Sequence, residues 1–253
     1  MSYQVENGVL LHAAALTGDV YDFMIKAPGI AKKAQPGQFV HVAVPGKTLR
    51  RPISLCGFNA EEGTLRLVFQ VRGEGTAMLA ALQEGATLDL LGPLGHGFPA
   101  PKEGQKALYV GGGIGVPPLL QASKAAGENA LICLGFRTAS AVILQQDFEQ
   151  NGATVYLATD DGSLGHHGFA ADCAKDLSFD VAYACGPTPM LRAVRDLAKE
   201  KGVPCYLSLE ERMACGVGAC LGCATPLIRE DGTKYFGHVC KDGPVFEAGS
   251  VDL

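Results

Sequence analysis

The sequence predicts a multidomain fold that combines the β and α/β classes, in three parts: an antiparallel β-barrel over residues 1–100, a parallel-sheet α/β domain over residues 101–207 and a small cysteine-rich segment over residues 208–253. Short segments of alternating hydrophobicity, separated by turn residues, predict the barrel. Apolar strands that alternate with helices predict the α/β domain. A chain of 253 residues has room for about two domains with their own cores plus this segment.

The first part contains strands that alternate between a buried and a solvated face. From Leu65 to Arg72, apolar and polar side chains take turns, which is typical of a half-buried strand. Residues 38–44 and 87–91 have similar patterns, and a short helix is expected over residues 76–82. Turn signals divide these segments at Pro28-Gly29, Pro36-Gly37, Pro45-Gly46 and Glu62-Gly63.

The second part has a different rhythm. Its predicted strands are short and apolar on both faces, as in a parallel sheet that helices cover on both sides. These strands span residues 107–110, 130–134, 154–158, 181–184 and 204–207. The intervening helices are expected at residues 117–126, 140–150, 168–177 and 189–201. Ligands of such sheets bind at the carboxyl ends of the strands.

A glycine-rich turn follows the first of these strands. Gly111, Gly112, Gly113 and Gly115 lie where a strand passes into a helix, so the backbone can approach a pyrophosphate at the helix N-terminus. The complete dinucleotide fingerprint is absent, because proline occupies the last glycine position and no acidic residue follows at the usual distance. The turn therefore predicts a nucleotide site, with a plain connector as the alternative.

A second turn, Cys185-Gly186-Pro187, ends a later strand of the same sheet. Gly186 would let a nicotinamide ring lie close to the backbone, with the Cys185 thiol beside it. A small buried cysteine that only completes a core strand explains Cys185 equally well. The polar turn over residues 159–163 can contact ribose or serve simply as a turn.

The barrel part contains two candidate phosphate contacts. Arg51, beside a turn expected at Pro52, can clamp a pyrophosphate, and the Ser54 hydroxyl can reach a flavin ring nitrogen or a ribityl oxygen. Gly75 and Thr76 open the expected short helix, another place where phosphate binds. The alternative for Arg50 and Arg51 is a solvated pair without function.

Four cysteines dominate the third part. Cys215, Cys220, Cys223 and Cys240 have the C-x4-C-x2-C spacing of plant-type [2Fe–2S] ligands, followed by one distant cysteine. The glycines of this loop permit the unusual backbone angles that wrapping a cluster requires. A four-thiolate zinc site is the alternative, although zinc sites usually pair two short cysteine knuckles. A disulfide framework is disfavoured, because no export signal precedes the nine cysteines.

Composition excludes several classes of partner. The net charge of −5 and the lack of a basic stripe argue against nucleic acid. The N-terminus has neither a basic nor an apolar region of a signal peptide. The most apolar stretch, residues 107–122, contains four glycines and two prolines and cannot span a membrane. A cytoplasmic protein without a membrane partner is expected.

Taken together, these motifs resemble the ferredoxin–NADP reductase superfamily, and the cysteine loop resembles its branch of electron-transfer subunits of NAD-dependent (type B) dihydroorotate dehydrogenases. The resemblance covers nearly the whole chain and is most specific at the loop that follows Leu209-Glu-Glu-Arg-Met213. It implies a flavoprotein that binds FAD, a [2Fe–2S] cluster and NAD. It implies no general acid or base, since the cofactors carry the chemistry.

The resemblance also assigns residues to each cofactor. The positions that match FAD-binding segments are Arg51, Pro52, Ile53, Ser54, Val68, Phe69, Gln70, Gly75 and Thr76. Those that match nicotinamide-nucleotide segments are Gly111, Gly112, Gly113, Gly115, Cys185, Gly186 and Pro187. The four tail cysteines match the cluster ligands. NADP remains open as the coenzyme, because Arg137, Thr138 and Ser140 follow the second strand, where a 2′-phosphate would be recognised.

The implied role is electron relay in pyrimidine biosynthesis. Electrons would arrive from a separate FMN-containing catalytic subunit that oxidises dihydroorotate, pass through the cluster to FAD and reduce NAD⁺, in a heterotetramer of two plus two subunits. One alternative is an NAD(P)H–acceptor reductase subunit that serves a ferredoxin, a hydrogenase or a sulfur reductase. Another is a nucleotide-binding regulatory module with a structural zinc tail. An exposed cluster loop is expected for either relay, whereas Val217 and Leu221 could instead pack into the core.

Overall fold

The computed structural model describes residues 3–253, and its N-terminal part is a closed β-barrel. The six strands pair in the order β1-β2-β5-β4-β3-β6, all antiparallel. They are β1 (Gln4–Ala15), β2 (Val20–Lys26), β3 (Phe39–Val42), β4 (Arg51–Asn59), β5 (Thr64–Gln70) and β6 (Thr87–Leu94). Two short helices, α1 (Pro28–Ala31) and α2 (Glu74–Ala80), close the barrel. The predicted antiparallel barrel is confirmed, although α2 begins two residues before the expected helix.

The barrel core follows the alternation of its strands. Leu65, Leu67 and Phe69 of β5 point inward with the other buried side chains of the barrel. The outward Val68 is buried as well, because it packs against apolar side chains of the second domain. The segment around Pro52, expected to be a turn, is part of strand β4, where Pro52 lies opposite His41. The Pro52 nitrogen faces the β5 side of β4, where pairing begins only at Leu55, so the missing N–H interrupts no ladder hydrogen bond.

The second domain is built on a seven-stranded sheet in the order β10-β9-β8-β7-β11-β12-β15. All pairs are parallel except β12 with β15. The strands are β7 (Ala107–Gly112), β8 (Ala130–Phe136), β9 (Thr154–Thr159), β10 (His166–His167), β11 (Val181–Cys185), β12 (Cys205–Ser208) and β15 (Val245–Glu247). The alternating strands and helices of the sequence are therefore confirmed.

The connecting helices are shorter than expected in three cases, α3, α4 and α5. They are α3 (Pro117–Ser123), α4 (Gln145–Gln150), α5 (Ala170–Cys173) and α6 (Thr188–Lys201), with 3₁₀ turns η1 (Gly113–Gly115), η2 (Gly127–Asn129) and η3 (Ala139–Ala141). The helix expected over residues 140–150 is divided, because Leu144 has a φ of 62°. The helix expected over residues 168–177 is reduced to α5. Helix α6 ends at Gly202, which adopts the left-handed conformation typical of a helix terminus.

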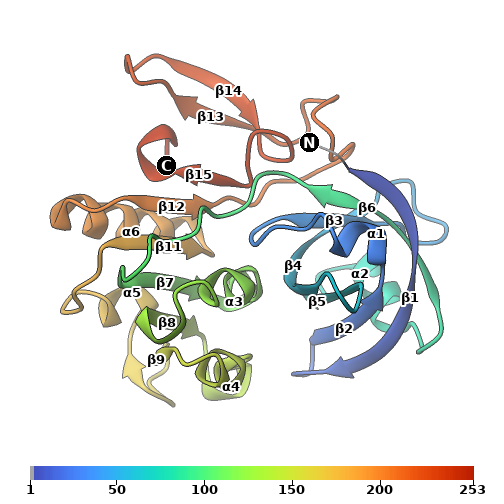
Figure 1. The fold of residues 1–253 in the computed structure, drawn as a ribbon, viewed down its shortest axis with the longest axis horizontal. Coiled ribbons are helices and arrows are strands. Elements are labelled where there is room, and N and C mark those ends of the chain that lie inside the picture. The colour runs from blue at the N-terminus through green and yellow to red at the C-terminus, as the bar shows by residue number, and fades with distance from the viewer. Residues whose placement is uncertain (1–2) are drawn as a thin grey trace.

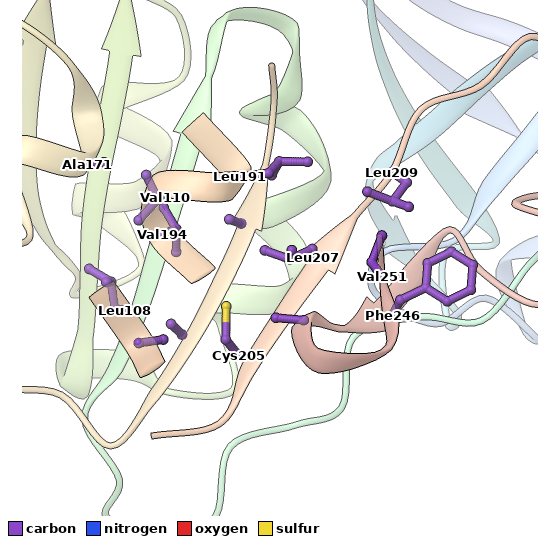
Figure 2. Close-up of a cluster of buried hydrophobic side chains, with 14 of the residues drawn as sticks. Leu108, Val110, Ala171, Leu191, Val194, Cys205, Leu207, Leu209, Phe246 and Val251 are labelled. Atoms are coloured by element: carbon purple, nitrogen blue, oxygen red, sulfur yellow. The ribbon is translucent and has the colours of Figure 1, made fainter. Parts of the chain in front are cut away.

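The cysteine-rich segment lies against both domains. A hairpin of β13 (Ala224–Ile228) and β14 (Lys234–His238) precedes β15 and the last 3₁₀ turn, η4 (Ala248–Ser250). Figure 1 shows this segment, in orange to red, along one side of both the barrel and the sheet. Phe246 and Val251 share a core with Leu207 of β12 (Figure 2). The His96 N–H donates to the Gly243 carbonyl oxygen (2.6 Å), so the end of the barrel also holds the segment.

A buried ion-pair network also connects the two domains. Arg66 of β5 donates to both carboxylate oxygens of Asp22 on β2 and to Asp147 of α4. All three side chains are mostly buried.

None of the helices within residues 3–253 has the length and apolar character that crossing a membrane requires.

Candidate functional site

A cavity of about 1220 Å³ separates the barrel from the sheet domain. The barrel contributes the turn over residues 17–20 and residues 70–72, and the sheet domain contributes the carboxyl ends of its strands. Leu209, Glu210 and Thr225 border the same cavity from the cysteine-rich segment. All three parts of the chain thus meet at the position where parallel sheets bind their ligands.

The two glycine-containing turns predicted from the sequence lie together on this cavity. Strands β7 and β11 are neighbours, so Gly111 lies opposite Cys185. A methyl group on Gly115 would overlap the carbonyl oxygen of Cys185, and one on Gly186 would lie 3.0 Å from the Gly112 nitrogen. Gly113 adopts a φ of +54° with open space around its Cα. The two turns therefore form one close-packed backbone surface that leaves room for a flat ligand.

Cys185 itself is turned away from solvent. Its side chain is only 1% exposed. Burial, with a smaller contribution from Glu210, raises the pKa of the Cys185 thiol to about 12, although Ser208 works in the opposite direction. The thiol is neutral at physiological pH, so Cys185 lies behind the cavity lining, next to Gly186, as a small apolar group and not as a nucleophile.

One end of the cavity carries both charge signs. Arg137 and Ser140, which follow β8, line the cavity together with Asp160, which follows β9. The Ser140 and Thr138 hydroxyl oxygens are 2.9 Å apart, and Ser163 accepts a hydrogen bond from the Ala139 N–H (2.8 Å). An arginine and hydroxyl groups suit a 2′-phosphate, whereas Asp160 suits a free ribose hydroxyl.

The barrel residues assigned to FAD lie on two surfaces. Gln70 lines the cavity, where its amide donates to Asp19 (2.6 Å). Val68 is buried at the domain interface, and Phe69 is buried against Phe23 in an edge-to-face contact. Of Val68 and Phe69, therefore, only the backbone atoms are free to contact a ligand. Arg51, Pro52, Ile53 and Ser54 belong to β4, outside the cavity lining.

Arg51 and Arg50 differ in their partners. Arg50 forms a bidentate ion pair with Asp89, in which the closest atoms are 2.7 Å apart. Arg51 instead donates to the Leu49 carbonyl oxygen (2.6 Å), and its guanidinium packs against Gly75, where a methyl group would overlap it. The Thr76 hydroxyl accepts from the N–H groups of Arg72 and Gly73, so it stabilises the start of α2. Arg51, Gly75 and Thr76 are thus brought together, as an anion site on the barrel requires.

The four tail cysteines all accept backbone hydrogen bonds. The Val217 N–H donates to Cys215 (3.5 Å) and the Gly222 N–H donates to Cys220 (3.5 Å). Cys215 and Cys220 are partly exposed, whereas Cys223 and Cys240 are buried. Within residues 3–253, no three histidine, cysteine, aspartate or glutamate side chains converge closely enough to hold a single metal ion. Three cysteines on one loop and a distant fourth supply the thiolate set that a [2Fe–2S] cluster takes, whereas zinc sites usually pair two short knuckles.

Backbone N–H groups surround these sulfurs. Gly218 donates to Cys240 (3.2 Å), Ala219 donates to Cys215 (3.3 Å) and the Cys240 N–H donates to Cys223 (3.5 Å). Gly216 and Gly218 have φ values of +72° and +76°, which turn the loop inward. Burial opposes ionisation of Cys215, but the Val217 N–H, Cys220 and the Ala219 N–H outweigh it and lower its pKa to about 6. The donor set therefore suits thiolates and a negatively charged cluster.

Side chains on this loop divide between the surface and the core. Leu221, between Cys220 and Cys223, is 78% exposed, as the expected docking surface requires. Val217 packs against the core that the loop shares with the sheet domain. The alternative, that Val217 and Leu221 pack into the core, is therefore wrong for Leu221, whereas Val217 is partly buried against that core.

His41 is a site residue that the sequence analysis missed. It lies on β3 and is fully buried, and its ring contacts the cysteine loop at Gly216. Burial, assisted by the charge of Arg50, lowers the pKa of His41 to about 4, so the imidazole is neutral at physiological pH. A histidine within an apolar strand carries no signal of such a contact, because the loop is more than 170 residues away in the sequence.

Comparison with known proteins identifies two domains of the chain and its relatives. Residues 8–98 match the model of the oxidoreductase FAD-binding domain, and residues 210–252 match that of the iron–sulfur cluster binding domain of dihydroorotate dehydrogenase B. The electron transfer subunit of dihydroorotate dehydrogenase B (NAD(+)) from Geobacillus thermodenitrificans is 47% identical over 92% of this chain and 93% of its own length. The same subunit from Bacillus cereus strain G9842 is 40% identical over 99% of each chain.

A solved structure extends the comparison to the fold. The NADH-dependent reduced ferredoxin–NADP oxidoreductase, studied for flavin-based electron bifurcation, aligns with a TM-score of 0.84 and 33% identity. The alignment covers 97% of this chain and 89% of that chain. The similarity therefore includes the barrel, the sheet domain and the cysteine-rich segment.

Proposed function

Since this chain belongs to the family of electron-transfer subunits of NAD-dependent dihydroorotate dehydrogenase B, we propose that it carries electrons from a separate catalytic subunit to NAD⁺. When bound, FAD supplies hydride exchange with the nicotinamide and the [2Fe–2S] cluster supplies single-electron transfer. The chain binds and orients these groups, and its own residues take no part as acid or base.

The cluster is assigned to Cys215, Cys220, Cys223 and Cys240. The observation that carries this assignment is that each of the four sulfurs accepts at least one hydrogen bond from a backbone N–H. Such donors stabilise thiolate ligands and offset the negative charge of the cluster. The partly exposed pair, Cys215 and Cys220, lies toward solvent, where a redox partner has access.

FAD binding is assigned to the outer face of the barrel. Arg51, over Gly75 and next to Thr76, would hold the pyrophosphate, and Ser54 would reach the flavin or its ribityl chain. Pro52 and Ile53 complete this strand, and Val68, Phe69 and Gln70 would contribute mainly backbone groups and the Gln70 amide. The match of residues 8–98 to an FAD-binding domain supports this assignment.

The nicotinamide nucleotide is assigned to the cavity at the sheet. Gly111, Gly112, Gly113 and Gly115 would lie along the pyrophosphate, and Cys185, Gly186 and Pro187 would border the nicotinamide. NAD is the proposed coenzyme, because Asp160 lies at the ribose end and the relatives are named for NAD(+). Because Arg137 lines the cavity as well, NADP is the competing coenzyme, and its binding is to be measured beside that of NAD.

The proposed partner is an FMN-containing catalytic subunit that oxidises dihydroorotate in pyrimidine biosynthesis, assembled with this chain as two plus two subunits in the cytoplasm. The exposed Leu221 beside the partly exposed cysteine pair supports docking at the cluster loop. The ferredoxin-linked alternative is less well supported, since the ferredoxin–NADP oxidoreductase is 33% identical and the dihydroorotate dehydrogenase B subunits are 40–47% identical.

One experiment tests the proposal directly. The protein is purified without oxygen, alone and together with its catalytic partner, and its absorption spectrum, iron, acid-labile sulfide, zinc and flavin are measured. We expect two irons, two sulfides and one FAD per chain, and dihydroorotate-dependent NAD⁺ reduction only in the complex. Zinc without iron would contradict the cluster, and turnover of dihydroorotate by the single chain would contradict the subunit role.

A further inference from the structure

His41 is a buried polar side chain without a protein partner. Its side chain is fully buried, yet among residues 3–253 neither ring nitrogen has a hydrogen-bond partner. An imidazole that is neutral has one N–H donor and one acceptor nitrogen, and leaving a buried donor unpaired costs about 1–3 kcal/mol. Such a group points to a ligand that the protein holds at this position.

The position of His41 identifies that ligand. Val40 and Val42 point into the barrel core, so His41 points out of the barrel. Its cross-strand neighbours are Pro52 on β4 and Leu91 on β6. The imidazole thus lies on the same face of the barrel as Pro52 and Ser54 of the proposed flavin strand.

The other side of the ring meets the cysteine loop. A Cβ atom on Gly216 would lie 2.8 Å from both Nδ1 and Cε1 of His41 and 3.1 Å from Nε2. Gly216 follows Cys215 directly and has a φ of +72°, so both its conformation and the imidazole require glycine there. The backbone of the loop and the ring are in close contact, with no side chain between them.

We propose that His41 donates a hydrogen bond from its ring N–H to the sulfur shell of the cluster, either a cysteine sulfur or an inorganic sulfide. This rests on the proposed cluster site. A donor to these sulfurs stabilises the additional negative charge of the reduced cluster and raises its reduction potential. A residue of the flavin-binding barrel thereby sets the potential of a cluster held by another part of the chain.

The first test measures reduction potentials. His41→Phe keeps a flat ring but removes the donor, and we expect the cluster potential, titrated by electron paramagnetic resonance, to fall while the FAD potential stays the same. His41→Gln restores an N–H donor and should recover part of the shift. His238→Gln is the matched control, because His238 is two residues from Cys240 but half-exposed and near Asp242. An unchanged cluster potential, or a shift of the flavin potential alone, overturns the proposal.

The second test takes its main signal from the wild-type protein, and variants serve only to assign that signal. In wild-type protein with ¹⁵N-labelled histidine, electron–nuclear double resonance of the reduced cluster should detect a nitrogen coupling and an exchangeable proton. Both signals should persist in His238→Gln, and the nitrogen coupling should vanish in His41→Gln. A normal cluster signal without histidine coupling overturns this proposal alone, whereas the absence of any cluster signal overturns the proposed function.

Discussion

The four cysteines of the tail differ in their surroundings. Cys215 and Cys220 are partly exposed, whereas Cys223 is 2% and Cys240 is 1% exposed. The outer pair lies beside the exposed Leu221, and the inner pair shares a core with Phe39 of the barrel. An electron that enters at the outer pair and leaves at the inner pair would therefore move from the surface toward the barrel.

We expect Cys220→Ser to abolish electron transfer to the catalytic subunit, because a ligand of the outer pair is lost. Oxidation of NADH by an artificial hydride acceptor should be retained, since that reaction needs only the flavin. Cys173→Ser is the control and should keep both activities, because Cys173 lies in α5 of the sheet domain and not in the cysteine-rich segment. Both rates are measured on the same preparation by stopped-flow absorption, and equal loss of the two activities would indicate a purely structural cluster.

Single residues also show the limit of sequence-based prediction. The spacing of four cysteines predicted the cluster site, because wrapping a cluster is a local property of one loop. The buried His41 was not predicted, since its contact with Gly216 joins two parts of the chain that only the fold brings together. Pro52 is expected in a turn but lies near the start of β4, because proline at the beginning of a strand has the same local signature as proline in a turn.

At the scale of elements, the network of Arg66, Asp22 and Asp147 is the main polar connection between the barrel and the sheet domain. Arg66→Met should lower the free energy of unfolding by about 2 kcal/mol, because two mostly buried carboxylates would lose their charged donor. Denaturation by urea, followed by circular dichroism, measures this loss. The control is Arg195→Gln, which removes a pair with Asp196 on α6 and should change little. Equal effects of the two variants would contradict the proposed importance of the network.

Secondary-structure elements were predictable where apolar side chains recur in a regular pattern along the chain. The alternation from Leu65 to Phe69 predicted β5, and the apolar runs predicted the five main parallel strands. Strand β1 was missed because Val5, Val9 and Leu11 are exposed, which obscures the alternation. Strand β15 has three residues and is stabilised by its pairing with β12, and so its own sequence contains little signal.

At the scale of the whole molecule, buried thiols cause the free energy of unfolding to fall at alkaline pH. Burial raises the pKa of Cys56, Cys185 and Cys205 to about 12, whereas in the unfolded chain a thiol titrates near 9. Above pH 9 the unfolded chain loses these protons first, so stability is complete below that pH and falls as pH rises toward 12. Between pH 9 and pH 12, each of these thiols lowers the free energy of unfolding by about 1.4 kcal/mol per pH unit.

Urea unfolding under reducing conditions at about pH 8 and about pH 10 tests this dependence. We expect lower stability at the higher pH. Cys205→Val removes one buried thiol. It should reduce the difference in the free energy of unfolding between the two pH values by roughly 1.4 kcal/mol. An identical difference in the variant and the wild type would show that Cys205 does not contribute.

Assembly with the proposed catalytic subunit provides another test at this scale. Leu221→Asp should raise the dissociation constant of the complex at least about tenfold, because a charge would replace an exposed apolar side chain at the proposed docking loop. Isothermal titration calorimetry with the catalytic subunit measures this change. Leu164→Asp, at a position 40% exposed on the sheet domain, is the control and should bind normally. Unchanged binding by Leu221→Asp would locate the interface elsewhere.

The pairing of β15 with β12 has a consequence for shortening the chain. A truncation after residue 208, intended to leave a cluster-free NADH-oxidising fragment, would strip the last parallel strand of its antiparallel neighbour and uncover Leu207. Open apolar strand edges recruit other copies of themselves, so such a fragment would aggregate. Replacing the cysteines and keeping the tail is therefore the sound way to isolate the flavin half of the reaction.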